Sequence, residues 1–240
     1  MMSHLGGWLF FLSLRLPEKS DDELAAQNQG LHWKQKEILC RKAAGDLLRR
    51  LWAQHPQGVT WDKAADSGLC RRVIARCARR LAGLRGAVNV WQTEHDERFT
   101  QNAPVIENPD RIHCRLYNLA RGHAVVCGRA EFGAADLAPV LEVTLDSVSP
   151  VRAKLFRHLL QAGGALATSQ VERLLRCSKP SALKEMEVLT VLGVTDKSEI
   201  APQNGRPEYQ ITLAPRFSWF VSAECPALSW PGTETQGGVF

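Results

Sequence analysis

The chain has 240 residues, of which 45% are hydrophobic and 23% are charged. These values are close to the averages for globular proteins, so they exclude a disordered chain, a collagen-like repeat and a multi-span membrane protein. Lysine and arginine number 30, and aspartate and glutamate number 25, which leaves a formal net charge of +5. An excess this small indicates nucleic acid only where the positive side chains are clustered.

The seven cysteines are spaced irregularly, and no two of them form a CxxC motif. An odd number at such spacings argues against a disulfide framework and against a zinc ribbon. Most of them lie in apolar helical patterns, where a reduced cysteine behaves as a small hydrophobic residue. We therefore expect free thiols, a reducing compartment and a cytoplasmic location.

Residues 1–30 are predicted to hold an N-terminal strand and a linker. The apolar run from Trp8 to Leu14 is too short to span a membrane, and the chain start lacks the charged region and cleavage site of a signal peptide. We interpret the run as a buried strand. In the polar linker, Ser20 and Glu23 have the spacing of a capping box, which predicts a helix start.

Two helical patterns follow, over residues 31–54 and 69–84. The first has an apolar stripe surrounded by lysines and arginines, and the second is rich in arginine. No acidic residue occurs between Asp66 and Glu94. The arginines form either a solvated helix face or a surface for phosphates. For the second case the candidate DNA-binding residues are Arg72, Arg76 and Arg79.

Shorter elements are predicted next. Residues 87–91 are typical of a strand, and residues 92–104 of a polar loop. Apolar residues in helical register then predict helices over 109–128 and 134–146.

The C-terminal third has clear helix start and stop signals. Ser149 before Pro150 predicts one helix start, and the capping-box spacing of Ser169 and Glu172 predicts another. Gly193 has the place of a C-terminal cap. The predicted elements are three helices, over 151–161, 170–176 and 178–192, followed by two strands, over 194–197 and 208–213.

Three helices followed by a hairpin resemble a winged-helix DNA-binding domain. The predicted fold class is therefore mainly α, with a helical N-terminal region and a C-terminal winged helix that has a β-hairpin wing. The predicted domains after the first 30 residues are 31–148 and 149–222, and 223–240 is a flexible tail. In a helix-turn-helix the second helix enters the major groove. The candidate DNA contacts are Ser178, Lys179, Ser181 and Lys184 of that helix and Arg206 of the wing tip.

The segment before the predicted winged helix contains a series of short motifs. These are Pro109-Asp-Arg111, Leu119-Ala-Arg121, His123-Ala124, Gly128-Arg129 and Asp136-Leu137. With these motifs, residues 107–148 resemble the helical lid of AAA+ ATPases of the minichromosome-maintenance and related helicase-like groups. A winged helix often follows such lids directly. The resemblance implies that lid arginines, here Arg111, Arg121 or Arg129, sense a nucleotide when an ATPase core is present.

The sequence departs from that family in one large respect. It contains no GxxxxGK[ST] motif and no strand that ends in an Asp-Glu pair, so nothing in it can hold phosphates and magnesium. We therefore expect a fragment or a degenerate relative that hydrolyses ATP only if another chain supplies the core. The seven histidines are scattered, and His113 with Cys114 and Cys127, or His95 with Asp96 and Glu97, make poor metal sites. We expect no enzyme activity, no metal and no cofactor.

The function predicted from the sequence is binding of double-stranded DNA as a part or degenerate relative of a helicase-like replication ATPase assembly. The expected partners are DNA and an ATPase subunit or a second copy of the chain, with no membrane. Two alternatives stay open. The helices at 31–54 and 69–84 and the strand at 87–91 also fit a first winged helix, which would make a tandem replication initiator or a transcriptional regulator. Glu185 and Glu187 instead favour a protein-docking winged helix.

Overall fold

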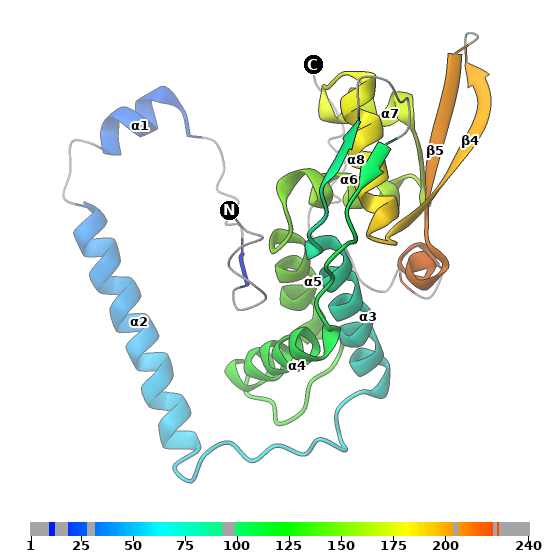
Figure 1. Cartoon of the computed structure of the whole chain (residues 1–240). Coiled ribbons are helices and arrows are strands. Elements are labelled where there is room, and N and C mark those ends of the chain that lie inside the picture. The colour runs from blue at the N-terminus through cyan, green and yellow to red at the C-terminus, as the bar shows by residue number, and fades with distance from the viewer. Residues whose placement is uncertain are drawn as a thin grey trace.

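The computed structural model describes residues 10–12, 19–27, 32–92, 99–203, 206–222 and 225. This part of the chain is mainly helical, with small antiparallel sheets (Figure 1). Its α-helices are α1 (Asp21–Gln27), α2 (His32–Gln54), α3 (Gly68–Arg85), α4 (Pro109–Val126), α5 (Leu137–Asp146), α6 (Pro150–Gln161), α7 (Thr168–Leu175) and α8 (Lys179–Val191). Short 3-10 helices are η3 (Ala134–Asp136) and η4 (Pro215–Val221). Within the described ranges, no helix is both long enough and apolar enough to cross a membrane.

The first two helices lie to one side of the others (Figure 1). The predicted capping box at α1 is confirmed, since Glu23 accepts from the Ser20 backbone N–H at 2.9 Å and its own N–H donates to the Ser20 hydroxyl at 3.3 Å. The helix predicted over 31–54 is confirmed as α2, but Trp33, Ile38 and Trp52 are 60%, 65% and 70% exposed. The apolar stripe of α2 therefore faces solvent.

The strand predicted from Trp8 to Leu14 falls mostly outside the described residues. Residues 10–12, which are described, are not in a strand. They lie against the end of α5 instead, because the Phe11 backbone N–H donates to the Ser147 hydroxyl at 2.8 Å.

The N-terminal part of the core is built by α3, α4 and α5. The helix α3 packs against both of the others, and it buries one side of its surface, including Ile74 and Leu81. The strand predicted over 87–91 is present as β1 (Val90–Gln92). It pairs with β2 (Phe99–Gln101). The prediction of a polar loop over 92–104 was therefore wrong for residues 99–101, which form this strand.

The C-terminal part has the element order α6, β3, α7, α8, β4, β5. Its strands are β3 (Ala165–Ala167), β4 (Thr195–Gln203) and β5 (Arg206–Leu213), and they form one antiparallel sheet in the order β3-β5-β4. The sequence did not predict β3, which has three residues and pairs with the end of β5.

The helices α6 and α8 agree with the prediction, and so does the stop signal of α8. The end of α8 is capped by Gly193, which has a φ of +64°, and its N–H donates to the Thr190 carbonyl at 2.8 Å. The capping box predicted for Ser169 and Glu172 was wrong, because α7 already begins at Thr168. The Ser169 hydroxyl donates instead to Glu208 of β5 at 2.6 Å.

The core is continuous from α3 through η4. At the junction, the Arg152 guanidinium of α6 donates to the carbonyls of Leu84 and Gly86 at the end of α3, at 2.8 and 2.7 Å. The side chain of Leu192, just after α8, lies directly against Gly86. Residues 68–148 and 149–222 thus share one hydrophobic core, to which none of the described side chains of α2 contributes a buried residue.

All seven cysteines are free thiols. Cys70, Cys77 and Cys225 are buried, and they are the ones that behave as small core residues. The expectation that the cysteines act as small hydrophobic residues was wrong for Cys40, Cys114 and Cys127. These three lie on the exposed sides of their helices or at a helix end.

Candidate nucleic-acid interface

The helix α8 has a buried side and a solvent side. Ala182, Met186 and Leu189 point into the core, as their helical spacing predicts. The solvent side carries predicted DNA contacts: Ser181 and Lys184 are exposed, and Lys179 is half-buried. The positive residues of this side lie in the N-terminal half of the helix.

The acidic residues of α8 face the protein. Glu187 forms an ion pair with Lys197 of β4. Glu185 lies near Arg152, where burial lowers the pKa of the guanidinium and the charge of Glu185 partly offsets this effect. Glu187 is therefore paired within the chain, and Glu185 lies close enough to Arg152 to affect its pKa.

The helices α7 and α8 are joined by a tight turn. Arg176 ends α7 in the left-handed conformation, with a φ of +52°, and Ser178 precedes the first turn of α8. The Ser178 hydroxyl lies 3.1 Å from that of Ser181. Hydroxyls at an exposed helix N-terminus are suited to a phosphate, because the backbone N–H groups there also point outward. Ser178 and Ser181 thus lie together.

The β4–β5 hairpin projects from the C-terminal part of the molecule (Figure 1). Its strands are longer than predicted, and Gln203 still pairs with Arg206. The side chain of Arg206, the predicted wing contact, lies outside the described residues.

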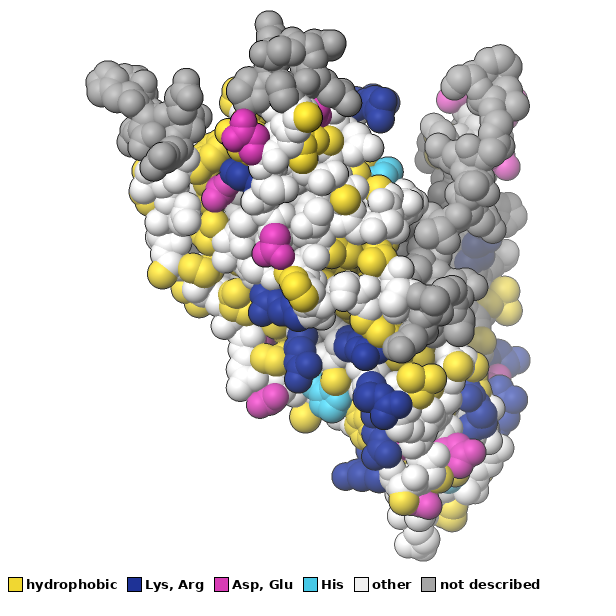
Figure 2. Space-filling model, turned by 90° about the vertical axis from the view of Figure 1, so that its right-hand side faces the viewer, with side chains coloured by type: hydrophobic (Ala, Val, Ile, Leu, Met, Phe, Trp, Pro, Cys, Tyr) yellow, Lys and Arg dark blue, Asp and Glu magenta, His cyan; other side chains and the backbone are white. Residues whose placement is uncertain are grey.

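The arginines of α3 fall into two groups. Arg72 and Arg79 are exposed, as is Arg71, which the list of candidates omitted. Arg76 is half-buried, and its guanidinium lies 4.2 Å from the centre of the Trp219 ring. Arg80 is fully buried between Phe156 and Phe220. Figure 2 shows Lys and Arg side chains gathered in the lower half of one face, at the end of the molecule that holds α3 and α4.

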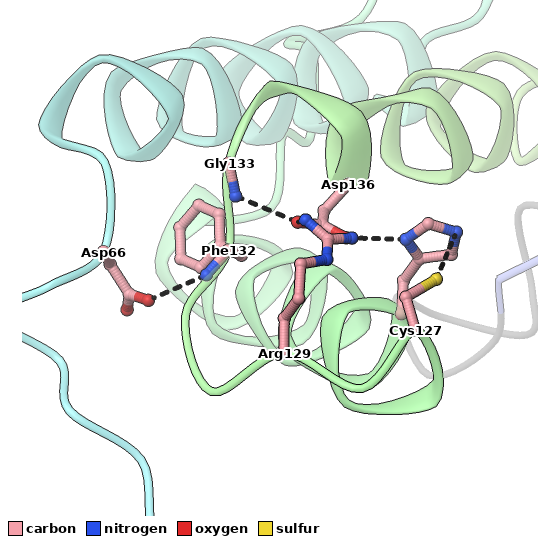
Figure 3. A network of polar contacts seen from close by, with 7 residues as sticks. Asp66, Cys127, Arg129, Phe132, Gly133 and Asp136 are labelled. Carbon is pink, nitrogen blue, oxygen red and sulfur yellow. Dashed lines mark hydrogen bonds and ion pairs between the residues drawn. The ribbon is translucent and has the colours of Figure 1, made fainter.

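A network of polar contacts joins α4 to the start of α5 (Figure 3). At its centre the fully buried carboxylate of Asp136 accepts from Arg129 at 2.8 and 2.5 Å, from the backbone N–H of Gly133 at 2.9 Å, and it lies 2.7 Å from Nδ1 of His123. Burial raises the pKa of Asp136, but these hydrogen bonds outweigh it and hold the pKa below its ordinary value. Three of the five short motifs of this segment, those that contain His123, Arg129 and Asp136, thus meet at one buried carboxylate.

The arginines that the lid resemblance singles out are all engaged within the chain. Arg129 contacts Asp136, as above. Arg111 forms an ion pair with Glu107 at 2.5 Å. Arg121 lies over the ring of Trp61, 4.6 Å from its centre.

A second group of positive side chains was missed by the sequence analysis. Lys154 of α6, Arg173 of α7 and Arg176, which follows α7, line one cleft. Lys154 lies in a different helix from the two arginines, and no local sequence motif joins the three residues. A helical-wheel projection shows which residues share one face of a helix. It does not show that these faces of α6 and α7 meet, because that depends on how the two helices pack.

Comparisons with other proteins add no relative to this picture. The chain matches no protein-family model, no curated protein and no solved structure.

Proposed function

We propose that residues 150–213 are a winged helix that binds double-stranded DNA through α8. The order of its elements and the β3-β5-β4 sheet support this assignment. In a helix-turn-helix, residues near the start of the second helix meet base edges or phosphates. The corresponding residues here are the exposed or half-buried polar ones at the start of α8.

The observation that carries the proposal is the separation of charge on α8. Lys179 and Lys184 lie on the solvent side, whereas Glu185 and Glu187 face Arg152 and Lys197. The phosphates of DNA attract a positive surface, so a helix N-terminus that presents Lys184 to solvent is suited to DNA. The same observation weakens the case for a protein-docking surface, which rested on the two glutamates.

The exposed arginines of α3 supply additional phosphate contacts in this proposal. Arg72 and Arg79 point to solvent, and Arg76 contributes less because it stacks on Trp219. Phosphate contacts of this kind strengthen binding without reading sequence.

We propose further that residues 107–148 act as a lid-like unit in a helicase-like assembly whose ATP-binding core is on another chain. The support is that three of the short motifs of this segment are joined by the contacts of Asp136 with His123 and Arg129. A first winged helix around α3 stays the alternative, because the exposed side of α3 carries Arg72 and Arg79.

The test is the salt dependence of DNA binding by the full chain. In the Lys179→Ala/Lys184→Ala variant we expect weaker binding and a plot of log K against log salt that is flatter by about two units, because each lost phosphate contact removes about 0.9. The matched control is Lys36→Ala/Lys42→Ala, which removes two exposed lysines from α2. Fluorescence anisotropy with a labelled duplex at several salt concentrations measures both.

An affinity and a slope equal to those of the unsubstituted protein would contradict the role of α8. If the Lys179→Ala/Lys184→Ala variant and the α2 control lose affinity equally, the binding is a general charge effect, and the proposal fails as well.

A further inference from the structure

A cleft of about 490 Å³ lies between α6 and α7, on residues that the proposed DNA contact does not use. Its polar lining consists of Lys154, His158 and Gln161 of α6 and Gln170, Arg173 and Arg176 at or beside α7. The other lining residues are Ala or Leu. None of the described residues that line the cleft is acidic.

The cleft concentrates positive charge in a small volume. Lys154, Arg173 and Arg176 each bring one positive charge to it, and three like charges so close together repel each other. Burial lowers the pKa of His158, and the charge of Lys154 lowers it further. The histidine therefore adds a neutral ring with hydrogen-bonding capacity to an electropositive site.

Lys154 is held in place by one of its three donors. Its ammonium group donates to the carbonyl of Leu174, near the end of α7, at 2.6 Å. An ammonium group has three N–H donors, so this bond fixes the group at the cleft and leaves capacity for a ligand.

The backbone at Arg176 points to a use for its side chain. Among the described residues it is the one non-glycine residue with a positive φ, at +52°. Glycine or asparagine adopts this conformation with less strain than arginine. An arginine at such a position indicates that its side chain serves a purpose that offsets the strain.

We propose that the α6–α7 cleft binds a phosphate-bearing anion. Guanidinium groups match phosphate oxygens with paired hydrogen bonds, and the amides of Gln161 and Gln170 supply further neutral donors. A cleft of this volume falls within the range that holds a nucleotide-sized ligand. Three cations suit a multiply charged phosphate better than a single carboxylate.

Two sources of phosphate fit this chemistry. One is a free nucleotide or polyphosphate. The other is the backbone of a DNA strand, since Arg176 stands two residues before Ser178 at the start of α8. The site does not depend on base contacts by α8, so it can exist even if the proposed winged-helix function fails.

The test uses the full chain and the Arg176→Asn variant. Asparagine tolerates the left-handed backbone, so we expect the melting temperature to stay the same or rise. With tripolyphosphate as the probe, isothermal titration calorimetry should show saturable binding that the variant weakens about tenfold or more, in line with the loss of a charge-assisted hydrogen bond. The control is Arg41→Gln, which removes one exposed arginine from α2.

The ring of His158 gives a second readout. A bound anion stabilises the protonated imidazole, so tripolyphosphate should raise the pKa of His158 in an NMR titration of the unsubstituted chain. The rise should be absent with chloride at the same ionic strength and reduced in Arg176→Asn.

The outcomes separate the two sources. Saturable tripolyphosphate binding that the variant loses and the control keeps supports a free anion. If tripolyphosphate does not bind but the variant weakens duplex binding and flattens its salt slope by about one unit, the cleft holds the DNA backbone. Equal behaviour of the variant, the control and the unsubstituted chain with both probes overturns the proposal. The Lys179→Ala/Lys184→Ala variant should bind tripolyphosphate normally, which distinguishes failure of this site from failure of α8.

Discussion

At the scale of single residues, the side chain of Asp136 joins three polar partners. Its buried carboxylate holds the side chains of His123 and Arg129 of the α4 end and the backbone at Gly133. A buried carboxylate is stable only when its oxygens are paired, and here they are paired by a cation and by N–H donors. The network fixes the turn between α4 and α5.

Replacing this carboxylate by an amide should destabilise the fold. In Asp136→Asn the charge that Arg129 pairs with is lost, so we expect the free energy of unfolding to fall by about 2 kcal/mol. Urea unfolding followed by circular dichroism measures it. The control Asp196→Asn, at an exposed position of β4, should change it by less than about 0.5 kcal/mol.

The same substitution has a defined pH signature. Because the pKa of Asp136 is lowered in the folded state, its contribution is present above the ordinary carboxylate pKa and is lost as the pH falls below about 4. Asp136→Asn should therefore show a flatter loss of stability in that acid range than the unsubstituted chain. Parallel curves for the two proteins would contradict this role.

The sequence shows where arginines are concentrated, but it does not show which groups surround each of them. The arginine-rich run of α3 was evident, but the periodicity does not show that Arg80 would be fully buried between aromatic rings and that Arg76 would lie on Trp219. These contacts depend on η4, which is more than a hundred residues away. The cleft residues were missed for the same reason.

At the scale of elements, the ends of α3 and α8 approach each other closely at Gly86. A Cβ atom at Gly86 would come within 2.5 Å of Leu192 and 3.1 Å of the Gly83 carbonyl. The glycine therefore lets the two helix ends meet, and a larger residue would push them apart.

Two glycine substitutions should have opposite effects. Gly86→Ala should lower the free energy of unfolding by about 1–3 kcal/mol, because it overpacks this junction. Gly122→Ala, in α4, meets nothing within 4 Å and should raise it by about 0.5–1 kcal/mol through helix propensity. Thermal unfolding measures the stability of both variants. An unchanged stability in Gly86→Ala would show that the junction between α3 and α8 is loosely packed.

Element predictions succeeded where local signals are strong. The amphipathic helices, the Ser20–Glu23 capping box and the Gly193 stop all follow from side-chain chemistry within a few residues. The strands β2 and β3 have three residues each, too few for an alternating pattern, and their pairing partners determine them.

At the scale of the whole molecule, the shared core predicts cooperative unfolding. Gly83 of α3 lies against Val194 and Phe217, so neither part keeps its core if the other unfolds. Two tryptophans report on different regions: Trp61 bonds to Asp66 beside α4, and Trp219 stacks on Arg76.

Single-tryptophan variants that retain only Trp61 or only Trp219 should therefore unfold at the same urea midpoint. Fluorescence of each variant, compared with circular dichroism of the same sample, gives the measurement. Two midpoints that differ beyond the effect of the substitutions on stability would show that residues 31–148 and 149–222 unfold separately.

In the proposed DNA contact, the partial burial of α8 would limit how many base pairs one chain can contact. Its accessible stretch, from Ser178 to Lys184, is about 10 Å long, which matches about three base pairs of duplex. A sequence of about three base pairs recurs throughout any genome, so a single copy bound in the proposed way could not select one particular site. Selective binding to one DNA site would require several copies of the chain bound side by side. Together they would contact more base pairs than a single copy does.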